Sequence, residues 1–459
     1  MALVLTGGIV ACPDGEHRCD VRIEGEKIAA LGFDVARPDD ELTDVSGCYV
    51  LPGGVDAHTH FDLPLGDGTR TADGFATGTR AAVAGGTTTI LDYATQFRGE
   101  ALKDALGNWH ALARGNCSCD YGFHMGITDW NRAARCEMPE IAEEGVTSFK
   151  MYMAYKGTLQ VDDAAIYSAL TTLRQVGGLL CVHCENGDVI SERANAMTRY
   201  AGAFPASHAQ SRPPETETEA VERLLFMAKL AAAPAYVVHV SAAPSMERII
   251  LAKADGARVY AETCPQYLFL HEGCYSGDGF EAAKYICAPP LRKKDNWKGL
   301  WDALRGGLAD VVATDHCSFN FVGQKDRGLS DFTKIPGGLP GVEHRMLLMY
   351  GAVADGRISL RRMTSLCSAN PAKIFGLYPR KGVVAPGSDA DLTILDPSGE
   401  TVISAATQRQ NVDYTPYEGF RVRGVIRSVY LRGTLLYTNG GFIADEPLGR
   451  FIKRGPSGA

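Results

Sequence analysis

From Tyr49 onward, short apolar runs alternate regularly with amphipathic segments. Eight of the runs are rich in strand-forming residues, and they end near His60, Tyr93, Ile127, Met153, His183, Val240, Thr263 and Asp315. The segments between them show helical periodicity, at 73–84, 101–114, 137–144, 162–176, 215–232, 244–253 and 295–304. Strands that alternate with helices favour a parallel sheet, and eight such units favour a closed barrel. We therefore predict an α/β fold built on a (β/α)8 TIM-like barrel.

The two ends of the chain follow a different pattern. Residues 1–50 form short strand-like runs separated by turn sequences, and 382–396 and 422–437 return to this pattern. The simplest assembly joins both ends into one small β-sandwich domain, interrupted by the barrel. We predict 1–50 and 376–445 as its two parts, 51–375 as the barrel and 446–459 as a tail. We expect residues 454–459 to be disordered.

The composition excludes some classes of function but does not identify one. The chain has 459 residues, of which 45% are hydrophobic and 22% charged, and its formal net charge is −8. Such a balance is ordinary for a globular protein and offers no basic stripe for a nucleic acid. The first residues lack the features of a signal peptide, and no apolar run approaches the roughly 18 residues that a membrane span needs. We expect a cytoplasmic protein with neither nucleic acid nor membrane as a partner.

Five of the apolar runs end on residues that can bind a metal ion: His58, His60, Lys150, His183, His239 and Asp315. Side chains two residues apart share one face of an extended chain, so the imidazoles of the His-x-His pair point the same way. Each candidate has a plainer interpretation when taken alone: a chance pair, a core histidine, or a helix cap for Asp315. Their shared place at strand ends, where barrel enzymes carry their chemistry, favours a metal-dependent enzyme.

Lys150 is unusual because it ends the apolar run Val146-Thr147-Ser148-Phe149. A buried ammonium is costly unless it is paired or chemically changed. The plainer interpretation is a lysine that extends its amine to solvent at the barrel rim. A neutral amine can instead take up CO2 and form a carbamate, which is a carboxylate able to bridge two ions.

The motifs around these residues resemble the binuclear amidohydrolases, and in particular the cyclic-amidase branch that contains D-hydantoinase and dihydropyrimidinase. The matching motifs occur in family order over nearly the whole chain. They are 53–60, 148–157, 182–186, 262–268, 289–292, 313–317, 385–392 and 417–419. A series of motifs in order is a far more specific signal than any one of them.

The resemblance implies a centre with two divalent ions, most simply Zn²⁺ with Mn²⁺ as the alternative. The His-x-His pair and Asp315 would bind the more buried ion, and His183 and His239 the more exposed one. Lys150, carboxylated by CO2, would bridge both ions together with a hydroxide.

The resemblance also implies a reaction, namely hydrolysis of the cyclic amide bond of hydantoins or dihydropyrimidines to N-carbamoyl amino acids. Asp315 would take the proton from the bridging hydroxide and pass it to the leaving nitrogen. Tyr155 would donate a hydrogen bond to the developing oxyanion, although a packed, inert rim tyrosine is the plainer interpretation. The partner would be a small cyclic ureide, and the assembly of relatives implies a homotetramer.

Ala288 and Gly338 would hold the cyclic imide through backbone groups. Here the chain departs from the family pattern, with Ala288 where relatives usually carry serine and Gly337 where they carry asparagine. An apolar wall suited to a ring substituent would come from loops beyond the strand ends, which otherwise are ordinary surface loops. Its candidate residues are Leu63, Leu65, Tyr93, Phe97 and Tyr152.

Two alternatives stay open. The first is an allantoinase-like ureide hydrolase, whereas a dihydroorotase is disfavoured because Phe61-Asp62-Leu63-Pro64 follows the His-x-His pair where that branch places an arginine. The second is a non-catalytic scaffold of the same fold, as in relatives that have lost their metal ligands. A metal assay separates these classes, because only an enzyme needs ions.

Overall fold

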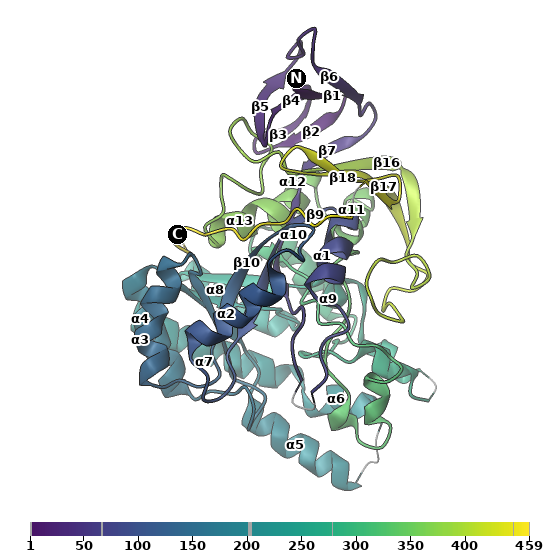
Figure 1. Ribbon diagram of the computed structural model, residues 1–459. Coiled ribbons are helices and arrows are strands. Elements are labelled where there is room, and N and C mark those ends of the chain that lie inside the picture. The colour runs from purple at the N-terminus through teal and green to yellow at the C-terminus, as the bar shows by residue number, and fades with distance from the viewer. Residues whose placement is uncertain (1, 66–67, 201–203, 278, 444, 459) are drawn as a thin grey trace.

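The barrel and the small domain occupy different parts of the molecule. Figure 1 shows the computed structural model, which describes residues 2–65, 68–200, 204–277, 279–443 and 445–458. In this view the helix-covered barrel lies below, and sheets from the two ends of the sequence lie above it. Within the described residues, no helix is long and apolar enough to cross a membrane.

The barrel is a sheet of eight strands in the order β15-β14-β13-β12-β11-β10-β9-β8, and each neighbouring pair is parallel. The strands are β8 Gly54–Thr59, β9 Thr87–Thr95, β10 Asp120–Gly126, β11 Ser148–Tyr152, β12 Leu179–His183, β13 Ala235–Val237, β14 Val259–Thr263 and β15 Val311–Val312. Nearly every residue in them is buried, because helices cover the outer face and side chains fill the inside. That burial explains the continuous apolar runs, and the predicted barrel is confirmed.

Helices lie between the strands near the predicted ranges. They are α1 Phe75–Ala84, α2 Leu102–Ala113, α3 Arg132–Glu143, α4 Asp163–Val176, α5 Gly187–Tyr200, α6 Ala206–Ser211, α7 Pro214–Ala231, α8 Ala243–Ala254, α9 Pro265–Phe269, α10 Asn296–Arg305, α11 Arg345–Ala354, α12 Leu360–Thr364 and α13 Asn370–Ile374. However, α3 begins earlier than predicted, and α5 and α6 were not predicted. Shorter 3-10 turns are η1 Glu272–Ser276, η2 Glu281–Tyr285, η3 Lys325–Gly328 and η4 Phe332–Lys334, and η5 Ser365–Ala369 is a π turn. The α4 N-cap Asp162 accepts a hydrogen bond from Ala165 N.

Backbone hydrogen bonds join the last strand to the first. His60 N donates to His316 O at 2.8 Å, and His316 N donates to His58 O at 3.3 Å. The segment after β15 therefore runs beside β8 at the C-terminal rim. This pairing brings the His-x-His pair next to Asp315, although the two segments lie far apart in the sequence.

Strands from both ends of the chain form the small β domain. A four-stranded sheet has the order β5-β4-β1-β6, and a seven-stranded sheet has the order β19-β18-β17-β16-β7-β2-β3. The strands are β1 Leu3–Thr6, β2 Ile9–Cys12, β3 Gly15–Arg18, β4 Asp20–Glu24, β5 Lys27–Gly32, β6 Glu41–Asp44, β7 Tyr49–Pro52, β16 Leu392–Val402, β17 Arg421–Leu431, β18 Thr434–Thr438 and β19 Gly441–Phe442. Val21, Val50 and Ile394 belong to one buried cluster. The predicted joining of the two ends is therefore confirmed.

A buried charge cluster ties the small domain to the barrel. Lys381 Nζ lies 2.6 Å from Asp120 Oδ2, 2.9 Å from Asp389 Oδ2 and 2.7 Å from Asp391 Oδ2. Asp120 begins β10, so this cluster lies at the N-terminal end of the barrel strands. Burial opposes the charge, but the three carboxylates raise the pKa of Lys381. The lysine is held as a cation, and both domains supply its partners.

The expected disorder at the end of the tail is wrong for residues 454–458, while Ala459 lies outside the described residues. Arg454 and Ser457 are buried. Thr147 Oγ1 donates to Gly455 O at 2.8 Å, and Gly458 N donates to Ile374 O at 2.8 Å. The tail is therefore held by hydrogen bonds to backbone and hydroxyl groups of the barrel. The composition of the tail does not predict these bonds.

Candidate metal centre and active site

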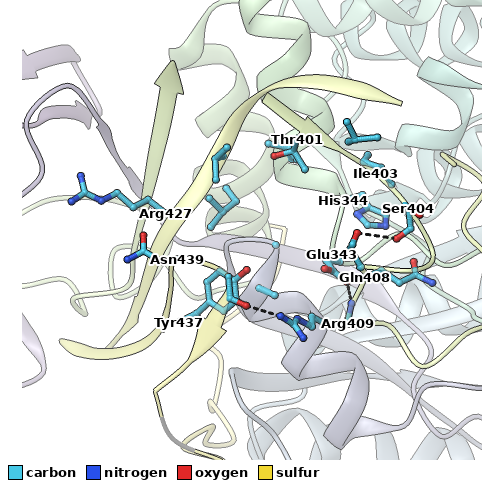
Figure 2. Close-up of a pocket in the computed structure, with 18 of the residues that line it drawn as sticks. Glu343, His344, Thr401, Ile403, Ser404, Gln408, Arg409, Arg427, Tyr437 and Asn439 are labelled. Carbon is cyan, nitrogen blue, oxygen red and sulfur yellow. Dashed lines mark hydrogen bonds between the residues drawn. The ribbon is translucent and has the colours of Figure 1, made fainter. Parts of the chain in front are cut away.

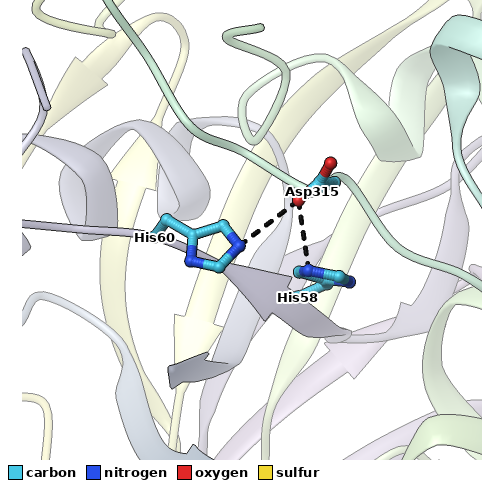
Figure 3. A group of neighbouring side chains, drawn as sticks. All are labelled: His58, His60 and Asp315. Atoms are coloured by element: carbon cyan, nitrogen blue, oxygen red, sulfur yellow. Dashed lines mark ion pairs between the residues drawn. The ribbon is translucent and has the colours of Figure 1, made fainter. Parts of the chain in front are cut away.

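His58, His60 and Asp315 form a compact group at the rim (Figure 3). Asp315 Oδ1 lies 3.1 Å from His58 Nε2 and 3.4 Å from His60 Nε2. One ligand atom from each residue lies within 4.8 Å of the others, a spacing that could hold a metal ion. Burial raises the pKa of Asp315, but His58 and His60 outweigh it, so the net direction is well below the ordinary value.

Glu262 orients His58 from behind. Its Oε1 lies 2.6 Å from His58 Nδ1 and accepts a hydrogen bond from His239 N at 2.9 Å, while its Oε2 accepts from Tyr236 OH at 2.8 Å. Burial lowers and Glu262 raises the pKa of His58, and the net direction is upward. An imidazole that gives Nδ1–H to a carboxylate leaves Nε2 for a metal ion.

The other candidate ligands lie beside this group. The ring centre of His239 is 5.4 Å from that of His58 and 4.5 Å from that of His183. Lys150 Nζ is 4.4 Å from the ring centre of Tyr93 and 5.1 Å from that of Tyr152. The structure therefore brings the six predicted ligands to one place, with Lys150 two residues before the end of β11 rather than at its end.

Burial favours the neutral form of several of these groups. It lowers the pKa of Lys150, lowers that of His183, and lowers that of His239 well below the usual range. None of the ion pairs among the described residues includes Lys150. A buried neutral amine is the form of lysine that can react with CO2.

Glu185 and Arg212 support His183. Glu185 Oε2 lies 2.7 Å from His183 Nε2 and accepts a hydrogen bond from Arg212 Nη1 at 2.6 Å. Burial raises the pKa of Glu185, but Arg212 and His183 outweigh it and lower this pKa to about 2. His183 therefore keeps Nδ1 for a metal ion. This role and that of Glu262 were not predicted from the sequence, although an acid two residues after a strand-end histidine shares its face and is a usable signal.

Three residues of the site adopt a left-handed backbone. The φ angles are 39° for His239, 52° for Asp315 and 67° for Tyr155. Such conformations are costly for residues with a side chain and gather at functional sites. β13 and β15 end before His239 and Asp315, so these two predicted ligands lie just beyond the strands rather than at their ends.

Tyr155 lies beside the candidate ligands. Its ring centre is 5.0 Å from that of His183, and the Arg212 guanidinium carbon lies 5.5 Å from the centre of the Tyr155 ring. Burial raises the pKa of Tyr155 well above its ordinary value. The phenol thus keeps its proton and remains a hydrogen-bond donor.

A cavity of about 770 Å³ opens beside Tyr155. Its walls include Leu65, Ala288 and Gly337. A Cβ added at Gly337 would meet only Ala288, at 3.9 Å from its Cβ, whereas one at Gly338 would lie 2.4 Å from Cys317 O. Position 338 therefore requires glycine, and position 337 has room for a side chain.

The remaining predicted substrate residues lie in different surroundings. Tyr93 is buried and its ring stacks at 5.1 Å on His60 and at 4.6 Å on His124. Tyr152 is buried, Leu63 packs partly buried against the main core, and Phe97 is 40% exposed. None of these four is among the described residues that line the cavity beside Tyr155.

A second cavity, of about 530 Å³, lies between the small domain and the barrel (Figure 2). Glu343 Oε2 accepts hydrogen bonds there from Arg409 N at 2.5 Å and Gln410 N at 3.2 Å. Burial raises the pKa of Glu343 to about 7. The cavity of about 770 Å³ is instead lined by Tyr155, whose ring centre is 5.0 Å from that of His183, so we place the chemistry at the barrel rim.

Comparisons with known proteins agree with this geometry. The sequence model of the amidohydrolase family matches residues 49–436. A D-hydantoinase from Streptomyces coelicolor is 46% identical over 98% of this chain and 97% of its own length. The crystal structure of a dihydropyrimidinase from Brevibacillus agri covers 100% of this chain and 99% of its own, with 43% identity and a TM-score of 0.98.

A more distant relative keeps the same architecture. An L-hydantoinase from Arthrobacter aurescens is 28% identical, has a TM-score of 0.90, and covers 98% of this chain and 99% of its own. Sequence and structure therefore agree over the full length. The chain belongs to the amidohydrolase family, in the branch of the D-hydantoinases and dihydropyrimidinases.

Proposed function

We propose that this chain hydrolyses the cyclic amide bond of hydantoins or dihydropyrimidines and releases N-carbamoyl amino acids. The observation that carries the proposal is the buried Lys150 among four histidines and Asp315 at the barrel rim. The high identity to D-hydantoinases over the full length supports the same reaction.

The residues present fit two divalent ions, for which we propose Zn²⁺ with Mn²⁺ as the alternative, and a carbamate formed from Lys150 and CO2. His58 Nε2 and His239 Nδ1 are buried without a hydrogen bond among the described residues, and His58 Nε2 faces Asp315 Oδ1 at 3.1 Å. Such orphaned nitrogens suit metal ligation better than a packed core. When bound, the ions would lower the pKa of a water molecule and polarise the substrate carbonyl.

The chain's own residues would move the proton and hold the charge. Asp315 takes a proton from the attacking water while the water oxygen bonds to the carbonyl carbon. The carbon–nitrogen bond then breaks, and Asp315 delivers the proton to the leaving nitrogen. Tyr155 donates a hydrogen bond to the carbonyl oxygen as negative charge develops on it.

The cavity beside Tyr155 would accept the rest of the substrate. We propose that backbone groups of Ala288 and Gly338 hold the ring, and that Leu65 contacts its substituent. We also propose that an apolar wall around the substituent includes Leu63, Tyr93, Phe97 and Tyr152. A homotetrameric assembly, which the family resemblance implies, and a cytoplasmic location are likewise proposals.

A substrate panel tests the function. Purified chain with Zn²⁺ or Mn²⁺ and bicarbonate is assayed against hydantoin, 5-phenylhydantoin, dihydrouracil and allantoin, with N-carbamoyl products detected by mass spectrometry. We expect turnover of a hydantoin or of dihydrouracil and about two ions per chain. Turnover of allantoin alone would favour the allantoinase alternative. A chain that binds no metal and turns over none of them would be a scaffold.

A further inference from the structure

A second lysine is buried beside the cavity, and no ion pair among the described residues includes it. Lys325, in η3, is 0% exposed. Its Nζ donates hydrogen bonds to Ile286 O at 3.0 Å and to Pro336 O at 2.9 Å. Both acceptors are backbone carbonyls, and they belong to two separate segments of the chain.

These two segments are the ones proposed to hold the ring. Ile286 precedes Ala288 by two residues, and Pro336 precedes Gly338 by two. Gly338 N also donates to Ile286 O at 3.0 Å, so this carbonyl accepts from both Lys325 and Gly338. The amine therefore lies at the junction of the two segments that approach each other across the cavity wall.

The surroundings of Lys325 match an uncharged amine. Its hydrogen-bond acceptors are neutral backbone carbonyls rather than carboxylates. Burial lowers the pKa of Lys325 to about 7. A neutral amine carries two N–H donors, which equals the number of carbonyls that it contacts.

Packing alone already holds η3 against the second segment. A Cβ added at Gly328 would lie 2.1 Å from Ile335 Cγ1, so these two residues are in close contact without help from the amine. A side chain with no polar group at position 325 would fill the space equally well and avoid burying an amine. The amine adds directional bonds rather than contact area.

We propose that Lys325 is a positioning residue that sets the spacing and direction of the 286–288 and 336–338 segments for the cyclic ureide. This inference rests on the proposed function. Loss of the two bonds would let the segments shift, and the ring would then sit out of line with Tyr155 and Asp315. A shift of about 1 Å at a reacting centre can cost on the order of 10²-fold in rate.

The test compares Lys325→Met, which has no donor, with Lys325→Gln, whose amide keeps two N–H donors on a shorter side chain. Lys298→Met is the matched control, because Lys298 is on the surface of α10 and pairs with Asp302 of the same helix. For each variant, kcat and KM are measured with hydantoin and with 5-phenylhydantoin, together with metal content and the unfolding temperature.

We expect Lys325→Met to raise KM for hydantoin about tenfold and to lower kcat/KM about 100-fold, with metal content unchanged. Lys325→Gln should fall between wild type and Lys325→Met, and it carries the test if the methionine variant does not fold. The loss should be smaller for 5-phenylhydantoin, whose ring substituent has wall contacts of its own. Lys298→Met should match wild type.

Two results would overturn the inference. If KM and the preference between the two hydantoins stay at wild-type values while only the unfolding temperature falls, Lys325 serves stability alone. If wild type itself hydrolyses no cyclic ureide, the proposed function fails and the role of Lys325 fails with it. The wild-type arm therefore separates the two failures.

Discussion

The two ends of the barrel bury a lysine in opposite ways. At the N-terminal end, Lys381 lies within 2.9 Å of three aspartate side chains. At the C-terminal rim, Lys150 is equally buried, but the aromatic rings of Tyr93 and Tyr152 lie around its amine where Lys381 has carboxylates. The carboxylates raise the pKa of Lys381, whereas burial lowers the pKa of Lys150.

This difference separates a group that serves stability from one that is available for chemistry. A buried charge is tolerated when partners of opposite charge surround it. Without such partners, the amine is held toward its neutral form, which is reactive. Four substitutions test this contrast, beginning with the largest expected effect.

Lys150→Ala should abolish activity and metal binding, because it removes the amine that would become the bridging carbamate. Metal content by elemental analysis and turnover of a hydantoin are the measurements, and short carboxylic acids should restore part of both. The intact mass of wild type should show added CO2. Retention of metal and activity by the variant would end the carbamate proposal.

Lys381→Met should act on stability instead. Removing one partner of a buried ionic cluster costs about 3 to 5 kcal/mol. Asp391 would lose its ion pair, while Asp120 would keep Arg432 and Asp389 would keep Lys27. Chemical denaturation should show this loss, while the folded fraction should keep the wild-type kcat and metal content. If Lys381→Met changed kcat per folded molecule as strongly as Lys150→Ala, the contrast between the two ends would be lost.

Tyr155→Phe removes a donor at the rim without changing the bulk of the side chain. We expect kcat to fall by roughly 10² to 10³-fold, as for the loss of one oxyanion donor. Steady-state kinetics with the best substrate of the panel measures it, and metal content should not change. An unchanged kcat with every cyclic ureide would show that Tyr155 is only a packed aromatic residue.

Glu185→Gln should have the smallest effect of the four. The amide keeps the shape but weakens the hold on His183, and loss of such a partner typically costs about 10 to 100-fold in metal affinity. Competition with a chelator measures the affinity. Glu219→Gln, at an exposed position on α7, is the matched control and should retain wild-type affinity. Equal metal retention in both variants would remove Glu185 from the site.

Much of the fold could be predicted from sequence because burial leaves a clear trace. The barrel strands are buried along nearly their whole length, so they appear as apolar runs whose ends coincide with His60 and His183. The six ligand candidates were predicted for the same reason, since parallel strands end at one rim. The ligand candidates lie near Asp315 because the segment after β15 pairs with β8 and closes the barrel.

Other features of the site and the tail depend on contacts between distant segments, which the hydrophobic periodicity of the sequence does not predict. Glu262 on β14 reaches His58 on β8, which is far away in the sequence, and Lys325 reaches two carbonyls in different segments. The buried tail is a similar case, because Thr147 and Ile374 hydrogen-bond to it from distant parts of the chain. Such pairings need the folded arrangement of the segments, not their local composition.

The pairing of β7 with β16 sets an order of events during synthesis. Leu51 lies opposite Thr393 in this pair, so β7 has no partner on that side until the ribosome has made the whole barrel. At about 5 to 20 residues per second, the wait is roughly 20 to 70 s. During that time one edge of β7 is open to pairing with another chain. Expression at high concentration should therefore favour aggregates that begin at this edge.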